Sequence, residues 1–296
     1  MSQKVITIAR RMMPRRRRTR AEIERIKGGL YEILKAQNPM TVRQVFYQAV
    51  TRGLIEKTES EYKQTVVRLL TKMRLRGEIP FSWIADFTRW QRKPQTFDSL
   101  ADALDQWATA YRRALWAEQP VYVEIWLEKD ALAGVVYEET SVYDVPLMVA
   151  RGFASLTFLH SAAEQIKTQG KPAYVYLLGD YDPSGVCATE TIARRLREFA
   201  PDAEIHFERL AVTEEQIRLF GLPTRPTKTT DSRAKSFGAE SVELDALPPE
   251  TLRALVRQAI EQHIDEEILE KTIIAERSER RLLTMLGREA FIGHGL

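Results

Sequence analysis

The spacing of apolar residues predicts three short helices near the N-terminus. Apolar side chains recur at intervals of three and four, the period of a helix with one buried face, over residues 20–35, 42–51 and about 60–76. Thr41 is placed to cap the second helix. Residues 79–89 could then form a β-hairpin wing. Three helices followed by a wing are typical of a winged helix-turn-helix domain, whereas three helices alone also fit a small bundle.

From residue 121 onward, short apolar runs alternate with helical patterns. Strands are expected at 121–127, 146–150, 173–178 and 204–210, and helices between them at 131–139, 155–167 and 184–199. This alternation predicts right-handed βαβ units, and therefore an α/β fold with a parallel sheet flanked by helices. Further helices are expected at 98–116, 213–220, 249–263 and from 271 to the end. The polar loop 223–237 is basic and could cover an active site; it contains Arg225, Lys228, Arg233 and Lys235.

The length of 296 residues and a hydrophobic fraction of 44% allow two domains with a core each. We divide the chain into a basic arm and winged-helix DNA-binding domain at 1–93, a connector helix at 94–118, and a catalytic domain with C-terminal helices at 119–296. The single cysteine, Cys187, excludes an internal disulfide and fits a reducing compartment. No apolar run is long enough to span a membrane, so we expect a soluble cytoplasmic protein.

The net charge of +3 hides a division along the chain. Residues 1–118 contain 24 Lys and Arg against 12 Asp and Glu, a net +12, and the remainder therefore carries −9. Such asymmetry predicts a nucleic-acid-binding part, associated with the nucleoid, joined to an acidic catalytic part. On the third helix, the side chains expected to bind DNA are Lys63, Arg68, Lys72, Arg74 and Arg76. The run 15–18 of four arginines could grip phosphate or form a disordered arm.

Three acidic residues stand where predicted strands end. Glu128 follows the run at 121–127, and Asp180 and Asp182 follow the run at 173–178. Open α/β sheets bind ligands at the carboxyl ends of their strands. Carboxylates gathered there repel one another unless a cation lies among them, and an all-oxygen site of few ligands suits Mg²⁺. We therefore predict a magnesium site for a phosphate ester; the alternative is an acidic turn in which Asp182 caps the next helix.

Tyr47 lies on the second predicted helix, four residues after Arg43. A tyrosine beside an apolar stripe is usually a core residue with its hydroxyl at the surface. On a DNA-binding helix, with an arginine nearby to hold a phosphate, its phenolate could instead attack the DNA backbone and form a covalent link. The residues alone leave both interpretations open.

Over roughly residues 20–265 the sequence resembles the topoisomerase VI A subunit and the related meiotic double-strand-break transesterase. The resemblance rests on Glu128-Lys129, on Asp180-x-Asp182-Pro183-x-Gly185, on Arg43-x-x-Phe46-Tyr47 and on the segment Val242-Glu243-Leu244-Asp245-Ala246-Leu247. It implies that residues 119–296 form a Toprim domain, the metal-binding domain of topoisomerases, primases and certain nucleases, preceded by a winged helix. Two departures stand out: Gln44 replaces a usual acidic residue, and residues 56–92 do not follow the family closely.

The resemblance also implies a reaction. Tyr47 would be the nucleophile, with Arg43 and Glu128 assisting, and Glu128, Asp180 and Asp182 would hold Mg²⁺. Double-stranded DNA would be the substrate of a homodimer in which the tyrosine of one protomer works with the metal site of the other, and strand passage would need a separate ATPase subunit. Two alternatives remain: a Toprim nuclease in which water attacks, and a DNA-binding protein with an inactive site. Topology control, recombination, phage defence and plasmid exclusion all stay open as the biological process.

Overall fold

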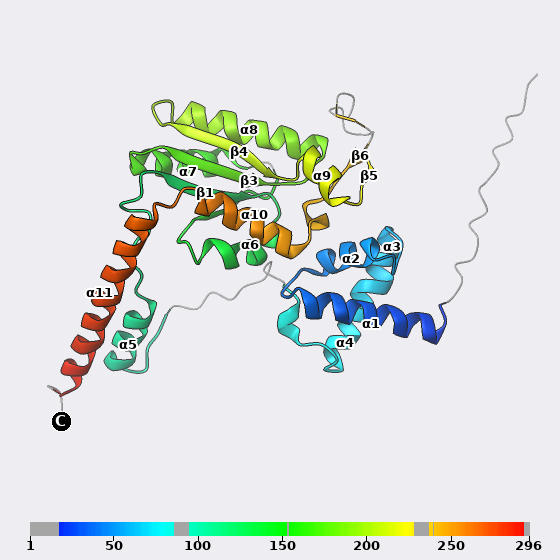
Figure 1. The fold of residues 1–296 in the computed structure, drawn as a ribbon, viewed down its shortest axis with the longest axis horizontal. Coiled ribbons are helices and arrows are strands. Elements are labelled where there is room, and N and C mark those ends of the chain that lie inside the picture. Colours follow the sequence, from blue (N-terminus) through cyan, green and yellow to red (C-terminus); the bar gives the residue numbers. More distant parts are fainter. Residues whose placement is uncertain (1–17, 86–94, 153, 228–236, 239, 293–296) are drawn as a thin grey trace, which may run out of the picture.

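The computed structural model describes residues 18–85, 95–152, 154–227, 237–238 and 240–292, with side chains as far as Met285. A helical N-terminal domain and a C-terminal domain built on a sheet lie side by side, and two helices project from the C-terminal domain (Figure 1). Residues 15–17 of the arginine run, 86–89 of the predicted wing and three basic residues of the predicted loop, Lys228, Arg233 and Lys235, lie outside the described residues.

The N-terminal domain contains the three predicted helices. They are α1 (Arg20–Ala36), α2 (Val42–Thr51) and a third made of α3 (Glu59–Glu61), a π-helix (Tyr62–Val67) and α4 (Arg68–Leu75). Thr19 and Thr41 each begin a helix with a capping box, and Gln44 supplies the returning side chain at Thr41. In the described part of the predicted wing we find no hairpin: Phe81–Trp83 is a 3-10 turn, and Ile84 forms a single bridge with Met40.

The C-terminal domain is built on a four-stranded parallel sheet in the order β2-β1-β3-β4. The strands are β1 (Tyr122–Leu127), β2 (Leu147–Val149), β3 (Ala173–Leu178) and β4 (Ile205–Ala211). Side chains alternate across β1, so that Val123, Ile125 and Leu127 enter one core cluster and Tyr122 and Trp126 enter the other. The mixed α/β fold and the parallel sheet predicted from the sequence are therefore confirmed.

Helices cover both faces of this sheet (Figure 1). On one face lie α6 (Ala133–Thr140), preceded by a 3-10 turn (Asp130–Leu132), and α10 (Pro249–Glu261). On the other lie α7 (Leu156–Gln169) and α8 (Pro183–Phe199). A short helix α9 (Glu214–Phe220), the two-stranded pair β5 (Arg225–Pro226) and β6 (Glu240–Ser241), and a 3-10 turn (Leu244–Ala246) lie near the carboxyl ends of the strands.

The remaining helices are α5 (Leu100–Ala110) and α11 (Glu266–Ile292), which pack against each other. The helix expected over 98–116 thus ends at Ala110, because Tyr111 leaves the helical conformation and its hydroxyl bonds Glu279 of α11. The tail helix begins at Glu266, five residues earlier than predicted, and the side chain of Arg280 donates to the backbone oxygen of Tyr111. None of the described helices is long and apolar enough to cross a membrane.

Candidate active site

The sheet order places the predicted carboxylates at a point where ligands are often bound. The chain runs from β1 outward to β2, then returns past β1 to β3 and continues to β4. The strand order therefore reverses between β1 and β3, and the crevice beyond the carboxyl ends of two such strands is the usual ligand site of an open α/β sheet. Glu128 follows β1, and Asp180 and Asp182 follow β3. The structure brings these three residues to one sheet edge.

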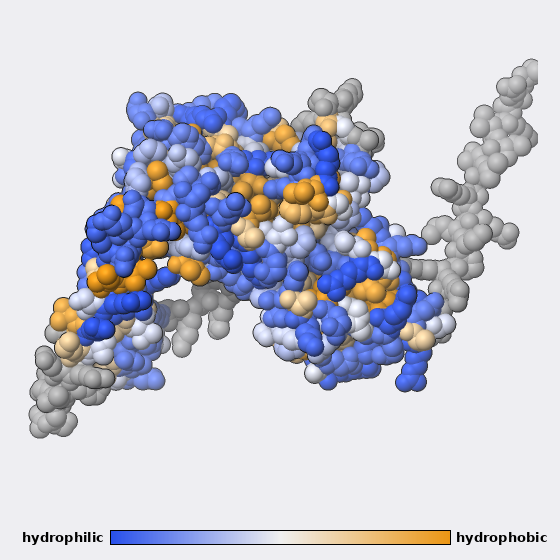
Figure 2. Space-filling model, in the orientation of Figure 1, coloured by the Kyte–Doolittle hydropathy of each residue, from blue (hydrophilic) through white to orange (hydrophobic). Residues whose placement is uncertain are grey.

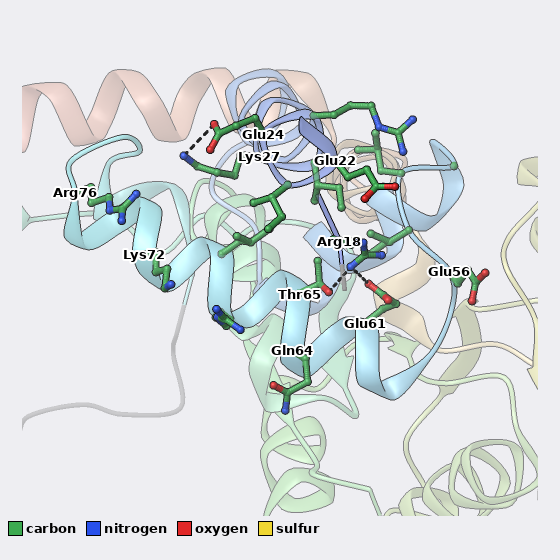
Figure 3. A pocket seen from close by; sticks show the side chains of 18 residues that line it. Arg18, Glu22, Glu24, Lys27, Glu56, Glu61, Gln64, Thr65, Lys72 and Arg76 are labelled. Carbon is green, nitrogen blue, oxygen red and sulfur yellow. Dashed lines mark hydrogen bonds and ion pairs between the residues drawn. The ribbon is translucent and has the colours of Figure 1, made fainter. Parts of the chain in front are cut away.

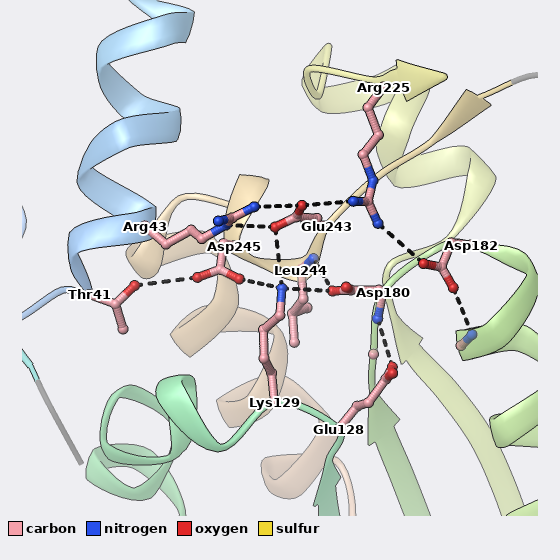
Figure 4. Close-up of polar contacts among 12 residues, drawn as sticks. Thr41, Arg43, Glu128, Lys129, Asp180, Asp182, Arg225, Glu243, Leu244 and Asp245 are labelled. Carbon is pink, nitrogen blue, oxygen red and sulfur yellow. Dashed lines mark hydrogen bonds and ion pairs between the residues drawn. The ribbon is translucent and has the colours of Figure 1, made fainter. Parts of the chain in front are cut away.

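Close backbone packing fixes the three carboxylates (Figure 4). Oε2 of Glu128 accepts a hydrogen bond of 3.0 Å from the backbone N–H of Asp180. Oδ1 of Asp182 accepts from the N–H of Gly185 at 2.8 Å and so caps α8, as in the alternative interpretation of this residue. A Cβ at Gly185 would lie 2.3 Å from the backbone oxygen of Asp180 and 3.2 Å from Oε2 of Glu128. Glycine at 185 therefore allows the first turn of α8 to lie close to Asp180 and Glu128.

Two further carboxylates, which the sequence analysis did not assign to the site, lie at the same edge. Tyr181 pairs with Val242 through two backbone hydrogen bonds of 2.8 and 2.9 Å, and this pairing carries Glu243 and Asp245 into the site. The N–H of Leu244 donates to Oδ1 of Asp180 at 2.8 Å. We call the resulting group the acidic cluster: Glu128, Asp180, Asp182, Glu243 and Asp245.

Three basic side chains enter the acidic cluster (Figure 4). Nζ of Lys129 lies 2.6 Å from Asp245, 3.2 Å from Asp180 and 3.5 Å from Glu243. Arg225 bridges Asp182 at 3.2 Å and Glu243 at 3.1 Å. Arg43 reaches across from α2 and donates two hydrogen bonds of 2.8 Å to the carboxylate of Glu243.

The pKa shifts follow from burial and from these charges. Burial raises the pKa of Glu128, and the negative charge of Asp180 raises it further. Burial also raises the pKa of Asp180, and this effect exceeds the opposite influence of Lys129. Glu243 shifts the other way: burial alone would raise its pKa, but the bonds from Arg43 and the charge of Lys129 lower it to about 2. The cluster therefore holds one firmly ionised carboxylate and two that an added cation would help to ionise.

The donor set suits a magnesium ion that keeps several waters, since such ions need only one or two protein carboxylates. Glu128, Asp180 and Asp182 come from adjacent strands, and the raised pKa of Glu128 and Asp180 reflects carboxylates that a cation would stabilise. As the side chains lie here, no three acidic, histidine or cysteine side chains among the described residues are grouped closely enough to hold a metal. Asp180 instead faces Lys129, and Asp182 faces Arg225.

Tyr47 lies beside the acidic cluster but is enclosed. Its side chain is only 1% exposed, its ring packs edge-on against Phe46, and Nζ of Lys57 lies 5.2 Å above the ring centre. Burial raises the pKa of the hydroxyl, and the charge of Glu243 adds to the rise, while Arg43 and Lys129 oppose it. Lys57, whose pKa burial lowers to about 8, also donates to the backbone oxygens of residues 223 and 224 and thereby ties the two domains together.

The other predicted DNA-binding residues lie apart from this site. In Figure 1, α2 faces the C-terminal domain while α4 lies on the other side of the helical domain. Arg68, Lys72 and Arg76 line a hollow of about 1040 Å³ between α1 and α4, opposite Lys27 (Figure 3). The other two residues predicted to bind DNA contact nearby side chains. Lys63 pairs with Glu59 at 3.2 Å, and the guanidinium of Arg74 stacks over the ring of Phe81. Arg43 therefore lies apart from the residues of the third helix that were predicted to bind DNA.

The sequence contains a pattern from which the additional charged residues of the site could have been predicted. Glu243 and Asp245 alternate with apolar residues in the same way as Asp180 and Asp182 do with their neighbours, and Lys129 directly follows Glu128. In comparisons with known proteins, no family model matches the chain and no curated protein matches it.

Proposed function

We propose that the protein is a magnesium-dependent DNA-cleaving transesterase resembling the topoisomerase VI A subunit, with a winged-helix N-terminal domain and a Toprim C-terminal domain. One observation carries the proposal. The helix that bears Tyr47 docks, through Arg43, on the same sheet edge at which Glu128, Asp180 and Asp182 meet. A nucleophile, a phosphate-binding guanidinium and carboxylates suited to a metal are the groups that phosphoryl transfer to a tyrosine requires.

In the proposed reaction, the Tyr47 hydroxyl gives its proton to water and its oxygen forms a bond to a backbone phosphorus. The bond from phosphorus to the 3′-oxygen breaks, which leaves a 5′-phosphotyrosyl link, and the leaving 3′-oxygen takes up a proton to become a hydroxyl. Arg43 holds the phosphate and stabilises the phenolate, and Glu128 exchanges the proton with the leaving oxygen. Asp180 and Asp182, with Glu128, would hold Mg²⁺, which neutralises charge on the phosphoryl oxygens when it is bound.

The proposal extends to the assembly. By the resemblance, the Tyr47 of one protomer would serve the carboxylates of the other, so that a homodimer on double-stranded DNA would have one composite site per strand. Strand passage would then depend on a separate ATPase subunit. In a single chain Tyr47 is 1% exposed, so the two domains must separate before this residue can reach a phosphate of DNA.

The same enclosure of Tyr47 favours a second candidate, a nuclease in which Glu128 and the metal site activate water. Replacing Tyr47 by Phe separates the two, because Phe preserves the packing against Phe46 and removes only the hydroxyl. We expect the wild type to convert supercoiled DNA with Mg²⁺ into cut DNA that carries covalently bound protein, and Tyr47→Phe to lose both cutting and adduct. Cutting by Tyr47→Phe without an adduct would establish the nuclease.

A matched change tests the metal site in the same assay. Asp180→Asn removes the charge but keeps an oxygen that can accept from the N–H of Leu244. It should abolish cutting and leave gel-shift binding to DNA intact. Binding with no magnesium-dependent cutting by either the wild type or the variant would point instead to a DNA-binding protein with an inactive site.

A further inference from the structure

Lys129 lies among three of the carboxylates of the acidic cluster (Figure 4). Its Nζ is 2.6 Å from Asp245, 3.2 Å from Asp180 and 3.5 Å from Glu243. A lysine ammonium carries three N–H donors and no acceptor, so these three carboxylates match its full capacity to donate hydrogen bonds. Lys129 therefore acts as a positive charge that the chain itself supplies to this part of the cluster.

Burial keeps this positive charge in place. The two domains touch on the face shown in Figure 2, and the side chains of Asp245 and Glu243 are 1% and 5% exposed. A carboxylate that has lost its water needs a partner of opposite charge. Glu243 has two arginines beside it. Within the described residues, the side-chain partners of Asp245 are Lys129 and, at 3.4 Å, the hydroxyl of Thr41. The buried charge of Asp245 therefore depends on Lys129.

Asp180 connects this part of the cluster to the predicted magnesium ligands. Its Oδ1 faces Nζ of Lys129 and accepts from the N–H of Leu244 at 2.8 Å. Its Oδ2 forms no contact with the residues that the structure describes. One oxygen of this carboxylate is thus held by an internal cation, and the other is left to bind Mg²⁺ together with Glu128 and Asp182.

Two-metal sites for phosphoryl transfer offer a comparison. Their two ions lie about 3.5–4 Å apart and stabilise both the attacking and the leaving oxygen. Ions this close can be bound by the two oxygens of one carboxylate, and Asp180 is arranged in this way with an ammonium on one side. With Nζ in place, no three acidic side chains in the described part of the chain stand close enough together to hold a metal. A second ion would therefore have to displace Lys129 from Asp180 and Asp245.

We propose that Lys129 is a positioning residue that takes the place of a second divalent ion, so that the active site binds a single metal ion. The ammonium holds Oδ1 of Asp180 and leaves Oδ2 for the metal, and Asp245 holds the ammonium in turn. The inference rests on the magnesium site of the proposed function, and it adds that this site is complete with one ion.

The test counts the metal ions bound to the full chain without DNA. Mn²⁺ is the probe because it prefers the same oxygen ligands as Mg²⁺, and the electron paramagnetic resonance signal of the unbound ion gives the number bound. The wild type should bind one Mn²⁺ per chain. Lys129→Met should bind two, because Met keeps the length of the side chain but removes the cation that Asp180 and Asp245 share.

Lys27→Met is the matched control. Nζ of Lys27 also lies between two carboxylates, Glu78 at 2.9 Å and Glu24 at 3.4 Å. These side chains are 32% and 60% exposed, so water can solvate both once the ammonium is gone. This variant should bind one Mn²⁺, as the wild type does.

A second variant and a second measurement address the case in which Lys129→Met folds poorly. The double variant Lys129→Met with Asp245→Asn removes both charges of the pair, so it leaves Asp245 without a buried charge and should bind one ion. Mg²⁺ should also raise the Tm of Lys129→Met more than the Tm of the wild type or of the double variant, because an additional ion binds only to the folded single variant.

The outcomes separate this inference from the proposed function. Two ions in the wild type would overturn the inference and leave the magnesium site standing. An unchanged count and an unchanged Mg²⁺ effect on Tm in Lys129→Met would do the same, and so would two ions in the double variant. No ion bound to the wild type would overturn the magnesium site itself, and the inference with it.

Discussion

The pair formed by Arg43 and Glu243 links the two domains, and its removal should loosen the helix that bears Tyr47. The Glu243 side chain is 5% exposed and accepts two hydrogen bonds of 2.8 Å from Arg43. The guanidinium of Arg225 also lies 3.1 Å from the Glu243 carboxylate. The change to test is Glu243→Gln, which keeps the shape and one acceptor oxygen but removes the charge. Arg43 and Arg225 are then left facing each other without their shared counterion.

The size of the effect follows from the shifted pKa. Glu243 titrates at about 2 in the folded protein, against an ordinary value of 4.5. At about 1.4 kcal/mol per pKa unit, the charged form contributes up to about 3 kcal/mol to folding at neutral pH. Because the folded pKa is the lower one, this contribution is complete above pH 4.5 and disappears as the pH falls towards 2. Since Arg43 is 31% exposed, we expect a loss of about 2 kcal/mol for Glu243→Gln at pH 7.

Two measurements check this expectation. Urea unfolding gives the stability change, and hydrogen exchange of peptides from α2 reports whether the helix opens more often. The matched control is Glu139→Gln, because Arg257 also binds Glu139 with two bonds, of 3.1 and 2.9 Å, but within the C-terminal domain. If exchange in α2 is as slow in Glu243→Gln as in Glu139→Gln, the pair does not hold the domains together.

Three further changes test other parts of the structure. Gly185→Ala should reduce cutting at least tenfold with DNA binding retained, because its Cβ would meet the backbone of Asp180 at 2.3 Å; a supercoiled-DNA cleavage assay measures this. Burial raises the pKa of Glu124, so its charged form destabilises the folded protein at high pH. In thermal unfolding at pH 8, Glu124→Gln should therefore be at least as stable as the wild type, and the difference in stability should shrink towards pH 5. Arg68→Ala and Lys72→Ala should each weaken DNA binding for all sequences and reduce the slope of log affinity against log salt by about one, as measured by fluorescence anisotropy titrations.

Local sequence patterns were sufficient to predict the strands and the position of the first carboxylates. The apolar runs that became β1 and β3 are buried on both faces and end in Glu128 and in Asp180 with Asp182, so the pattern located both the strand ends and the sheet edge. Because β1 and β3 pair in parallel, the residues that follow their carboxyl ends lie at the same edge of the sheet. The bounds of α2 were also predicted correctly, because the capping residue Thr41 acts through nearby backbone groups.

Local patterns could not show which distant segments of the chain come into contact. Glu243 and Asp245 reach the site only because Val242 pairs with Tyr181, some sixty residues earlier in the chain. The enclosure of Tyr47 likewise depends on Lys57 binding the backbone at 223 and 224. Helical periodicity over 98–116 could not show that the helix ends at Ala110, since that end is fixed by α11.

The acidic cluster and the enclosed tyrosine are coupled by the same contact. Arg43 neutralises Glu243, and by doing so it holds α2 against the sheet edge with Tyr47 inside. A negative phosphate that drew Arg43 away would remove a cation from the cluster and release the hydroxyl-bearing helix in one step. The carboxylates would then lack part of their internal counterion, which makes them better ligands for an added cation. Access to the tyrosine and affinity for a metal should therefore rise together.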